Sequence, residues 1–479
     1  MKTSESQHLQ VVIVGAGPAG LTAAVELGRA GISSQVLESD SVVGGISRTV
    51  ERDGWRFDIG GHRFFTKVER VESFWHQILD DGKFMSRPRL SRIYYNNRFF
   101  DYPLKAMNAL RNLGPIESVR CVLSYIWVRL RPPSDLKTFE GWVASRFGWR
   151  LYRIFFKTYT EKVWGVAAGE IQADWAAQRI KNLSLLKAVV NAVLPKWRRG
   201  TVTSLIDEFQ YPQLGPGMLW EECAEVAKGL GSRIHMDQRV IRLVAKESRV
   251  ESVVTQNSHG QISTFDASHV LTSMPLSEVV LAVDPPAPDQ VIQAACQLRH
   301  RDFMTVALVV KVENTFPDNW IYIHDSSVHV GRIQNFRSWS PFMVKEGQTC
   351  LGLEYFVNQG DDLWMMDDSE LIELAKRELE YLKLVDTTLI SHGYVVRMPK
   401  AYPMYDTQYE QNVLRIREWL AESLTNLQPI GRNGMHRYNN QDHSMLTAML
   451  AVENICGASH DLWSVNVEDD YHEEKKTGT

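Results

Sequence analysis

The chain has few cysteines, no long apolar run and no repeat or low-complexity segment. Its five cysteines are scattered over 479 residues without a CxxC pair, which argues against a disulfide framework and a structural zinc site and is typical of a reducing compartment. The longest apolar stretch, 183–194, is interrupted by polar residues and is too short to span a bilayer. We therefore expect neither a metal site nor membrane insertion.

An excess of charge of one sign is also lacking. The 53 basic and 57 acidic residues leave a net charge of −4, so nothing indicates nucleic-acid binding. The polar N-terminus reaches an apolar run at residue 11 and leaves no room for a secretion signal. With 44% hydrophobic residues and enough length for two or more domains, we expect a globular, cytoplasmic protein.

What is present is a glycine-rich turn near the N-terminus. The apolar run 11–14 leads into Gly15, Gly17 and Gly20, and an acid, Glu38, closes the next apolar run. In a strand–turn–helix unit these glycines permit a tight turn, let the backbone approach a pyrophosphate and let the helix pack closely on the sheet. An acid at this spacing accepts hydrogen bonds from a ribose. The segment predicts a dinucleotide site.

A second glycine pair, Gly44-Gly45, follows Glu38 and precedes Ser47. A nicotinamide enzyme has no standard need for such a pair, although an ordinary surface turn would also contain one. The arrangement resembles the flavoprotein superfamily of amine oxidases, phytoene desaturases and UDP-galactopyranose mutases, in which a second glycine pair helps to hold the pyrophosphate of FAD. We therefore predict FAD as the cofactor.

Hydrophobic periodicity outlines the remaining organisation. The region 103–197 is expected to be helical, with one helix near 119–130 and a more mixed one through Trp142, Ser145, Arg146 and Trp149. Strands are expected at 239–244, 248–256, 262–265 and 269–275, a second sheet from 304–312, 320–324 and 349–356, and helices over 370–384 and 445–455.

These patterns predict an α/β fold with a discontinuous Rossmann-like FAD-binding domain. It would comprise residues 1–90, 205–290 and 405–465. A mainly helical domain, 91–204, and an antiparallel sheet domain for substrate, 291–404, would be inserted in it, with a flexible tail over 466–479. Because ligands of such folds bind beyond the carboxyl ends of the strands, the insertions are expected to cover the flavin ring.

Three polar segments are candidates for chemistry. Gly60-Gly61 allow backbone to lie against a flat ring, and His62 could hydrogen-bond near its edge or be purely structural. The segment 156–165 mixes aromatic and charged residues, as would a catalytic wall or an ion-paired core helix. The segment 437–444 leads into a helix and could bind a ring or diphosphate, or simply provide a cap through Asp442 or Ser444.

Together these segments resemble the UDP-galactopyranose mutases over most of the chain. The matching strings are the glycine motif, Gly60-Gly61-His62, 98–105, 138–142, Tyr159-Thr160-Glu161-Lys162 with Trp164, 175–179, Tyr211-Pro212 with 215–217, Arg332 before 339–341, Tyr402-Pro403, Gly431-Arg432 and 440–444. The resemblance implies an isomerase that converts pyranose and furanose forms of a UDP-sugar through an adduct between the sugar and N5 of reduced FAD. NADPH or NADH could be the reductant, bound transiently because no second complete dinucleotide motif is present.

The resemblance also implies residue roles. Arg179 and Arg332 would clamp the diphosphate and His62 would line the flavin; these three are the catalytic candidates. Further substrate-binding candidates are Tyr102, Lys105, Tyr159, Thr160, Trp164, Tyr402 and Tyr438. The cofactor-binding candidates are Gly15, Gly17, Ala19, Gly20, Glu38, Gly44, Gly45, Ser47, Gly60, Gly61, His62, Val240, Gly431, Arg432, Asn440, Gln441 and Ser444.

The chain departs from the family at several positions. Leu104 and Lys105 stand where eukaryotic members have phenylalanine and glutamine, and Thr160 replaces an asparagine. The stretch before Asn440 is two residues shorter than in eukaryotic members, so a tyrosine that contacts the diphosphate could correspond to Tyr438 or to His436.

Two alternatives to a mutase remain. One is an FAD-dependent oxidase or desaturase with an apolar substrate tunnel, and the other is a noncatalytic FAD-binding protein. Neither requires paired arginines over the flavin. The expected partners are a nucleotide-sugar substrate and, for a homo-oligomer, other copies of the chain.

Overall fold

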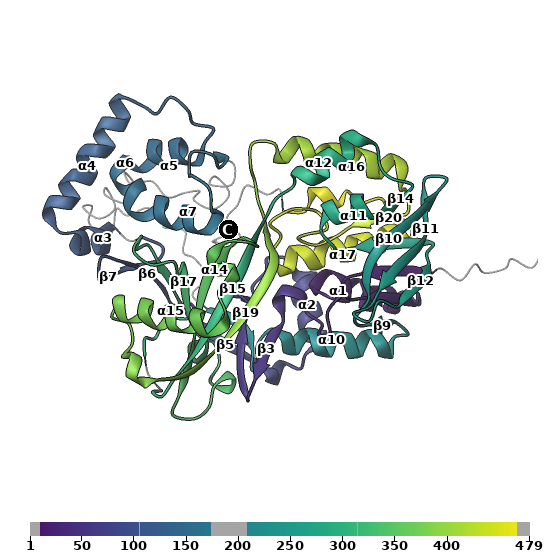
Figure 1. Ribbon diagram of the computed structural model, residues 1–479, viewed down its shortest axis with the longest axis horizontal. Helices are drawn as coiled ribbons and strands as arrows, with labels where there is room; N and C mark the ends of the chain where they lie inside the picture. Colours follow the sequence, from purple (N-terminus) through teal and green to yellow (C-terminus); the bar gives the residue numbers. More distant parts are fainter. Residues whose placement is uncertain (1–9, 105, 174–207, 314, 467–479) are drawn as a thin grey trace, which may run out of the picture.

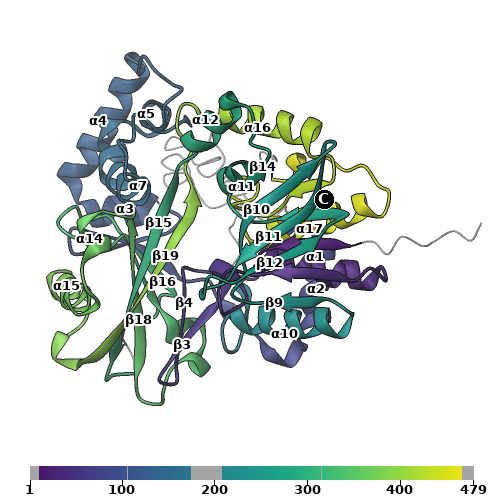
Figure 2. The same cartoon turned by 45° about the vertical axis from the view of Figure 1, so that its right-hand side comes forward.

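The computed structural model describes residues 10–104, 106–173, 208–313 and 315–466. A parallel sheet with its helices lies on the right in Figure 1, a long antiparallel sheet lies in the middle, and the helices of residues 106–164 lie at the upper left; Figure 2 shows the same arrangement from another side. Lys105 and Arg179 lie outside the described residues, as do the apolar stretch 183–194 and residues 467–479.

A five-stranded parallel sheet forms the base of the first part. Its order is β20-β13-β1-β2-β9, and every neighbouring pair is parallel. Alternate residues of β1 pack into the cores on opposite faces of this sheet. The strands are β1 (Val11–Val14), β2 (Ser34–Leu37), β9 (Arg233–His235), β13 (His269–Thr272) and β20 (Leu427–Pro429).

Each face of the parallel sheet has its own cover. One face packs against four helices, α1 (Pro18–Arg29), α2 (Glu69–Ile78), α10 (Gly217–Gly229) and α17 (Gln441–Ile455). The other packs against a four-stranded sheet of β10 (Arg239–Lys246), β11 (Arg249–Gln256), β12 (Ile262–Asp266) and β14 (Val283–Asp284), and against α11 (Leu276–Ala282), α12 (Asp289–Gln297) and α16 (Tyr409–Ser423). Burial of β1 on both sides explains its continuous apolar sequence.

The glycines after β1 fit their predicted roles. Gly15 has a φ of +100°, which a residue with a side chain rarely adopts. A Cβ on Gly20 would lie 1.8 Å from the Gly15 carbonyl oxygen, so only glycine allows α1 to start this close to the end of β1.

The second part is a seven-stranded sheet of order β19-β15-β18-β17-β16-β6-β7. All pairs are antiparallel except β16 with β6. One face packs against α14 (Asp362–Met365) and α15 (Asp368–Tyr381). The other face packs against residues of a hairpin, β3 (Thr49–Arg52) and β4 (Trp55–Asp58). The sheet strands are β6 (Ser91–Tyr95), β7 (Arg98–Asp101), β15 (His300–Val310), β16 (Trp320–Ile323), β17 (Arg332–Asn335), β18 (Thr349–Val357) and β19 (Ile390–Pro403).

The third part is the helical insertion, which packs around its own apolar cluster. Its helices are α3 (Ala106–Leu113), α4 (Pro115–Leu130), α5 (Phe139–Phe147), α6 (Trp149–Tyr152), a π-helical turn η3 (Arg153–Lys157) and α7 (Thr158–Trp164). The remaining short elements are β5 (Phe84–Pro88), β8 (Glu208–Pro212), α13 (Phe336–Trp339), η1 (Gly45–Ser47), η2 (Asp81–Lys83), η5 (Pro341–Met343), η6 (Thr387–Leu389) and η7 (Leu462–Ser464).

The predicted α/β fold, with a Rossmann-like domain, an inserted helical domain and an antiparallel sheet, is confirmed. The structure differs in detail from the expected helical region. Residues 91–101 form β6 and β7 and extend the seven-stranded sheet. The mixed helix expected through Trp142 and Trp149 is two helices, because Gly148 between them has a φ of +82°.

Two kinds of feature are absent from the described residues. No described helix is both long and apolar enough to cross a membrane. The described part of the chain also contains no group of three or more His, Cys, Asp or Glu residues arranged to hold a metal ion.

The close approach at Gly20 gives a test of the first turn. We expect Gly20→Ala to lower the free energy of unfolding by about 1–3 kcal/mol, the usual effect of overpacking a rigid core. Gly229→Ala is the matched control, since Gly229 is also helical and a Cβ there meets no atom within 4 Å. Urea denaturation of both variants would measure the difference, and equal stabilities would contradict the packing argument.

Candidate functional site

Two glycine segments face each other beyond the carboxyl ends of β1 and β2. A Cβ on Gly17 would lie 3.8 Å from the Gly45 Cα, and one on Gly45 would lie 3.4 Å from the Gly17 Cα. The Gly44 N–H donates to the Ala16 carbonyl at 2.8 Å, and Ser47 is buried in the following turn. The first turn of α1 and the second glycine pair thus form a narrow backbone cradle in which side chains would occupy the space.

Glu38 lies at the end of β2, beside this cradle. Its carboxylate accepts hydrogen bonds from the Ala16 N–H at 2.6 Å and from the Asp40 N–H at 2.9 Å. The Gln238 N–H donates to the Glu38 carbonyl at 2.7 Å, so the start of β10, which includes the half-buried Val240, runs alongside. These contacts give Glu38 a fixed orientation at one end of the predicted cofactor site.

The segment before α17 closes the other side of the cradle. A Cβ on Gly431, whose φ is +77°, would lie 3.0 Å from the Ala19 Cβ and 4.0 Å from the Ser444 Cβ. The helix cap differs from the expectation. Asn440, rather than Asp442 or Ser444, is the N-cap of α17, because the chain turns into the helix one residue before Gln441.

Gln441 joins α17 to the loop that follows β4. Its Nε2 donates to the Arg63 carbonyl at 3.0 Å, and within the described residues its buried Oε1 has no hydrogen-bond partner. The α17 N-terminus and the loop of His62 therefore lie side by side.

The loop Gly60-Gly61-His62 begins at a buried carboxyl group. Asp58 accepts hydrogen bonds from the Tyr211 hydroxyl and from the Thr49 hydroxyl at 2.9 Å, and burial raises its pKa to about 7. The Gly60 φ of +87° turns the backbone sharply. A Cβ at Gly60 would lie 3.9 Å from both an Arg332 Nη2 atom and the Tyr402 hydroxyl, so two sheet residues meet this loop.

His62 is half-buried near the guanidinium groups of Arg332 and Arg432. Burial, with Arg432 and Arg332 nearby, lowers its pKa to about 3. Among the described residues no partner for its buried Nδ1 is present. The ring is therefore neutral at physiological pH.

The strand register builds the anionic and cationic centre of the site. Tyr322 on β16, Arg332 on β17 and Glu354 on β18 are directly opposite one another in successive pairs, which places their side chains on one face. The Arg332 Nε donates to Glu354, and Gln334, two residues along the same face, donates to the other Glu354 oxygen. The buried Glu354 carboxylate thus fixes the orientation of the Arg332 side chain.

The electrostatics of this pair keep Arg332 charged. Burial would lower the pKa of Arg332, but the Glu354 carboxylate raises it well above its usual range. Burial raises the pKa of Glu354, while Arg332 and Gln334 oppose that rise. The guanidinium is therefore a permanent cation on the inner surface of the site.

Tyrosines line the site around Arg332. Tyr402, at the end of β19, stacks on Tyr438 with ring centroids 5.6 Å apart, and the Arg432 guanidinium lies 4.8 Å from the Tyr438 ring. Burial raises the pKa of Tyr402 above its usual range, so its hydroxyl remains a hydrogen-bond donor. His436 is instead fully buried, with its ring centroid 4.6 Å from that of His300, so Tyr438 and not His436 lies beside Tyr402.

Helix α7 contributes Tyr159, whose ring packs against residues of the seven-stranded sheet region. Tyr159 stacks on His324 at 5.1 Å with nearly parallel rings, and meets Tyr322 edge-on at 5.3 Å. Tyr102, after β7, packs 4.9 Å from Tyr322. Thr160 is buried on the same helix.

Two cations attach α7 to the seven-stranded sheet. The Lys162 Nζ donates to the Asp325 carbonyl at 2.5 Å and the Val330 carbonyl at 3.0 Å. Arg301 donates to the Val163 carbonyl at 3.2 Å and to the Phe356 carbonyl at 2.6 Å. These bonds hold the helix that carries Tyr159 in a fixed position on the sheet.

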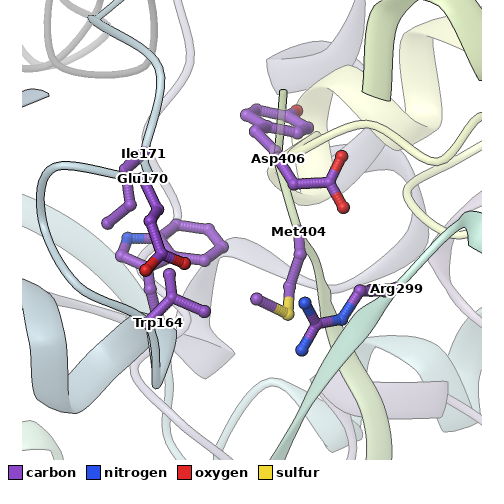
Figure 3. Close-up of a pocket in the computed structure, with 8 residues that line it drawn as sticks. Trp164, Glu170, Ile171, Arg299, Met404 and Asp406 are labelled. Carbon is purple, nitrogen blue, oxygen red and sulfur yellow. The ribbon is translucent and has the colours of Figure 1, made fainter. Parts of the chain in front are cut away.

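Trp164, at the end of α7, lines a pocket of about 40 Å³ between the insertion and the end of β19. In Figure 3 Trp164, Glu170 and Ile171 form one side, and Arg299, Met404 and Asp406 form the other. Ligand sites for nucleotide-sized molecules have volumes of several hundred Å³, so this pocket alone is too small for a nucleotide.

The comparisons with known proteins agree with this architecture. A family model for NAD(P)-binding Rossmann-like domains matches residues 13–78. The family model for flavin containing amine oxidoreductases matches residues 169–411, just over half of the chain. The chain belongs to this flavoprotein family. The flavoprotein superfamily and a flavin cofactor, both predicted from the two glycine segments, are confirmed by this match.

Solved structures and a curated relative show narrower similarity. A crystal structure of reduced UDP-galactopyranose mutase superimposes with a TM-score of 0.82 at 20% identity and covers 97% of this chain and 99% of that one. A putative protoporphyrinogen oxidase from Exiguobacterium sp. gives 0.69 at 17% identity, covering 93% and 98%. A probable UDP-galactopyranose mutase from Klebsiella pneumoniae is 26% identical over 172 residues, 34% of this chain and 43% of that protein.

The curated matches are partial. The alignments with the first three curated relatives cover only 20%, 26% and 43% of those proteins. The structural likeness, by contrast, extends over nearly the whole chain. The similarities thus establish the fold and the flavoprotein family, and the choice of reaction depends on the site.

Buried histidines give a pH-dependent prediction. Burial lowers the pKa of His324 to about 3, so its ring stays neutral in the folded protein. In the unfolded chain the same ring takes up a proton below about pH 6.5. Stability from this residue is thus complete at neutral pH and is lost as pH falls. Between pH 7.5 and 5 it contributes a loss of about 2 kcal/mol.

We expect urea denaturation of His324→Gln to show a smaller loss of stability on acidification than the unsubstituted protein. His259→Gln, at an exposed turn position, is the control and should keep the full loss. The same pH dependence in both variants would show that His324 is not a source of acid sensitivity.

Proposed function

We propose that the protein is an FAD-dependent nucleotide-sugar mutase that interconverts pyranose and furanose forms of a UDP-sugar. The observation that supports it is the Arg332 guanidinium beside Gly60, held by buried Glu354, with the Tyr402 hydroxyl beside the same glycine. Such a fixed cation with hydroxyl donors suits a diphosphate leaving group, since bidentate guanidinium contacts and charge-assisted hydrogen bonds stabilise phosphate oxygens.

The residues present fit FAD. Gly17 and Gly45 present bare backbone on neighbouring turns, which suits a pyrophosphate that lies against helix-start amides, and Glu38 is placed to accept from the adenosine ribose. His62 Nδ1 and Gln441 Oε1 are buried polar atoms without partners among the described residues, as expected for groups that contact a ring system. Bound and reduced, the flavin would supply the nucleophile for the anomeric carbon of the sugar.

The protein's own residues would bind and orient the substrate. Arg332 and the Tyr402 hydroxyl would bind the departing diphosphate, and Tyr438, beside Arg432, would extend this surface. Neutral His62 would hold a hydrogen bond near the flavin without bringing a further charge. Arg179, outside the described residues, remains our proposed second arginine of the clamp, as Lys105 remains a proposed contact to the nucleotide.

An oxidase reaction is the alternative, because the family is described as amine oxidoreductases and several similar proteins are oxidases by description. Hydride transfer from an amine or a polyene calls for an apolar surface next to the flavin. The described site instead presents Arg332, Glu354 and Gln334 on one face, so the surface next to Gly60 is polar rather than apolar.

The assay that separates the two reactions uses the dithionite-reduced holoprotein with UDP-galactopyranose and a panel of other nucleotide sugars. We expect chromatography to show a furanose product only after reduction. No isomerisation of any nucleotide sugar, together with peroxide production from an amine by the oxidised protein, would support the oxidase.

Arg332 gives the sharpest mutational prediction. Arg332→Ala should weaken UDP binding by about 2–4 kcal/mol, the cost of losing one partner of a desolvated charge pair. Because this variant leaves Glu354 buried without its cation, Arg332→Met with Glu354→Gln should be measured beside it and should show the same loss with normal flavin content. Calorimetric titration with UDP would give the affinities.

The matched control is Arg417→Ala. This change removes an arginine of α16 that is paired with Asp461, away from the site. It should leave UDP affinity unchanged. Unaltered affinity in both Arg332 variants would remove this residue from the proposed clamp.

A further inference from the structure

The outer face of α4 is apolar and exposed. Ile116, Leu123 and Leu130 are 71%, 60% and 75% exposed, and their spacing of seven residues puts them on one side of the helix. The same stripe is completed by Val119, Val122, Ile126 and Trp127, each at least 40% exposed. Cys121 and Val128, on the opposite side, are buried in the insertion.

This face is unusual for a protein surface. Single exposed apolar residues need no explanation, but a contiguous set of seven along four helical turns indicates an interaction site. In Figure 1 α4 forms the left edge of the molecule, beyond the seven-stranded sheet and away from the parallel sheet. A partner could therefore cover it without touching the cofactor cradle.

Basic residues border the stripe on both sides. At about 100° per residue, exposed Arg120 lies next to Ile116 on one border and exposed Arg129 lies next to Val122 on the other. Arg131 follows at the helix end, with its guanidinium 4.9 Å from the Trp127 ring. The acid of the helix, Glu117, is shared between two arginines: it binds Arg150 of the insertion at 3.0 Å and Arg120 at 3.4 Å.

We propose that α4 docks on an anionic lipid surface. An interfacial helix presents leucine, isoleucine and tryptophan to the acyl boundary and basic residues to the headgroups, and it lies in the plane of the membrane without spanning it. The Arg120 and Arg129 borders suit lipid phosphates. The whole chain, at a net charge of −4, would otherwise be repelled by such a surface, so the local charge of α4 determines both binding and orientation.

A second copy of the chain fits this face less well. A two-fold interface sets the same patch against itself. That would bring the arginine borders together, and the acid that the described α4 offers is already bound to Arg150. Charge complementarity therefore favours lipid over self-association.

The test is sedimentation of the full-length holoprotein with vesicles of phosphatidylcholine alone or mixed with phosphatidylglycerol. We expect binding to the mixed vesicles, weakening in high salt. Leu123→Glu with Ile126→Glu should reduce binding at least tenfold, and Arg120→Gln or Arg129→Gln about fivefold each. Ile262→Glu, on exposed β12, is the matched control and should bind like the unsubstituted protein.

Three outcomes would overturn the proposal. These are no sedimentation with either vesicle, equal binding of the Leu123/Ile126 variant and the control, and a concentration-dependent dimer, seen by light scattering, that this variant abolishes. The last result would assign α4 to self-association. Normal flavin content and circular dichroism of each variant would establish that the fold is intact.

Discussion

The Arg332–Glu354 ion pair is the interaction on which the character of the site depends. Glu354 lies fully buried in the middle of a strand, where an unpaired carboxylate would be strongly unfavourable. Its two oxygens are bound by Arg332 and Gln334, so the guanidinium is held next to Gly60 without freedom to swing away. Buried ion pairs contribute little to net stability, and we propose that this one serves to hold Arg332 in place for an anionic group.

The two sheets make different contributions that meet at the loop Gly60-Gly61-His62. The parallel sheet supplies backbone: tight glycine turns and a helix start, which suit a cofactor pyrophosphate. The antiparallel sheet supplies side chains in a row, because register places Tyr322, Arg332 and Glu354 opposite one another. Helix α7 completes the wall, and the bonds of Lys162 and Arg301 to strand and loop carbonyls keep it on the sheet.

The sequence was most informative where structure is local. The turn after β1 needs glycine at Gly15 and Gly20 for reasons of backbone geometry that act within a few residues, so motif and fold could be predicted together. Arg332 and the tyrosines were found through family resemblance. Glu354, Gln334 and Tyr322 were missed, since their place depends on the pairing of strands that are far apart in the chain. The alternation of Arg332 and Gln334 was the one local signal.

Other differences have equally local causes. The expected mixed helix is divided at Gly148, whose positive φ ends α5, and glycine within an apolar pattern is easily overlooked. Residues 91–101 form a hairpin that extends the seven-stranded sheet, although their position next to a helical region suggested otherwise. Neither difference affects the loop or the strands that build the site.

The most direct test of the account is a crystal structure of the reduced holoprotein with UDP. The account predicts that the diphosphate lies between the Arg332 guanidinium and the Tyr402 hydroxyl, over Gly60, with Glu354 still bound to Arg332. UDP bound at another place, with Arg332 in contact only with protein, would contradict it.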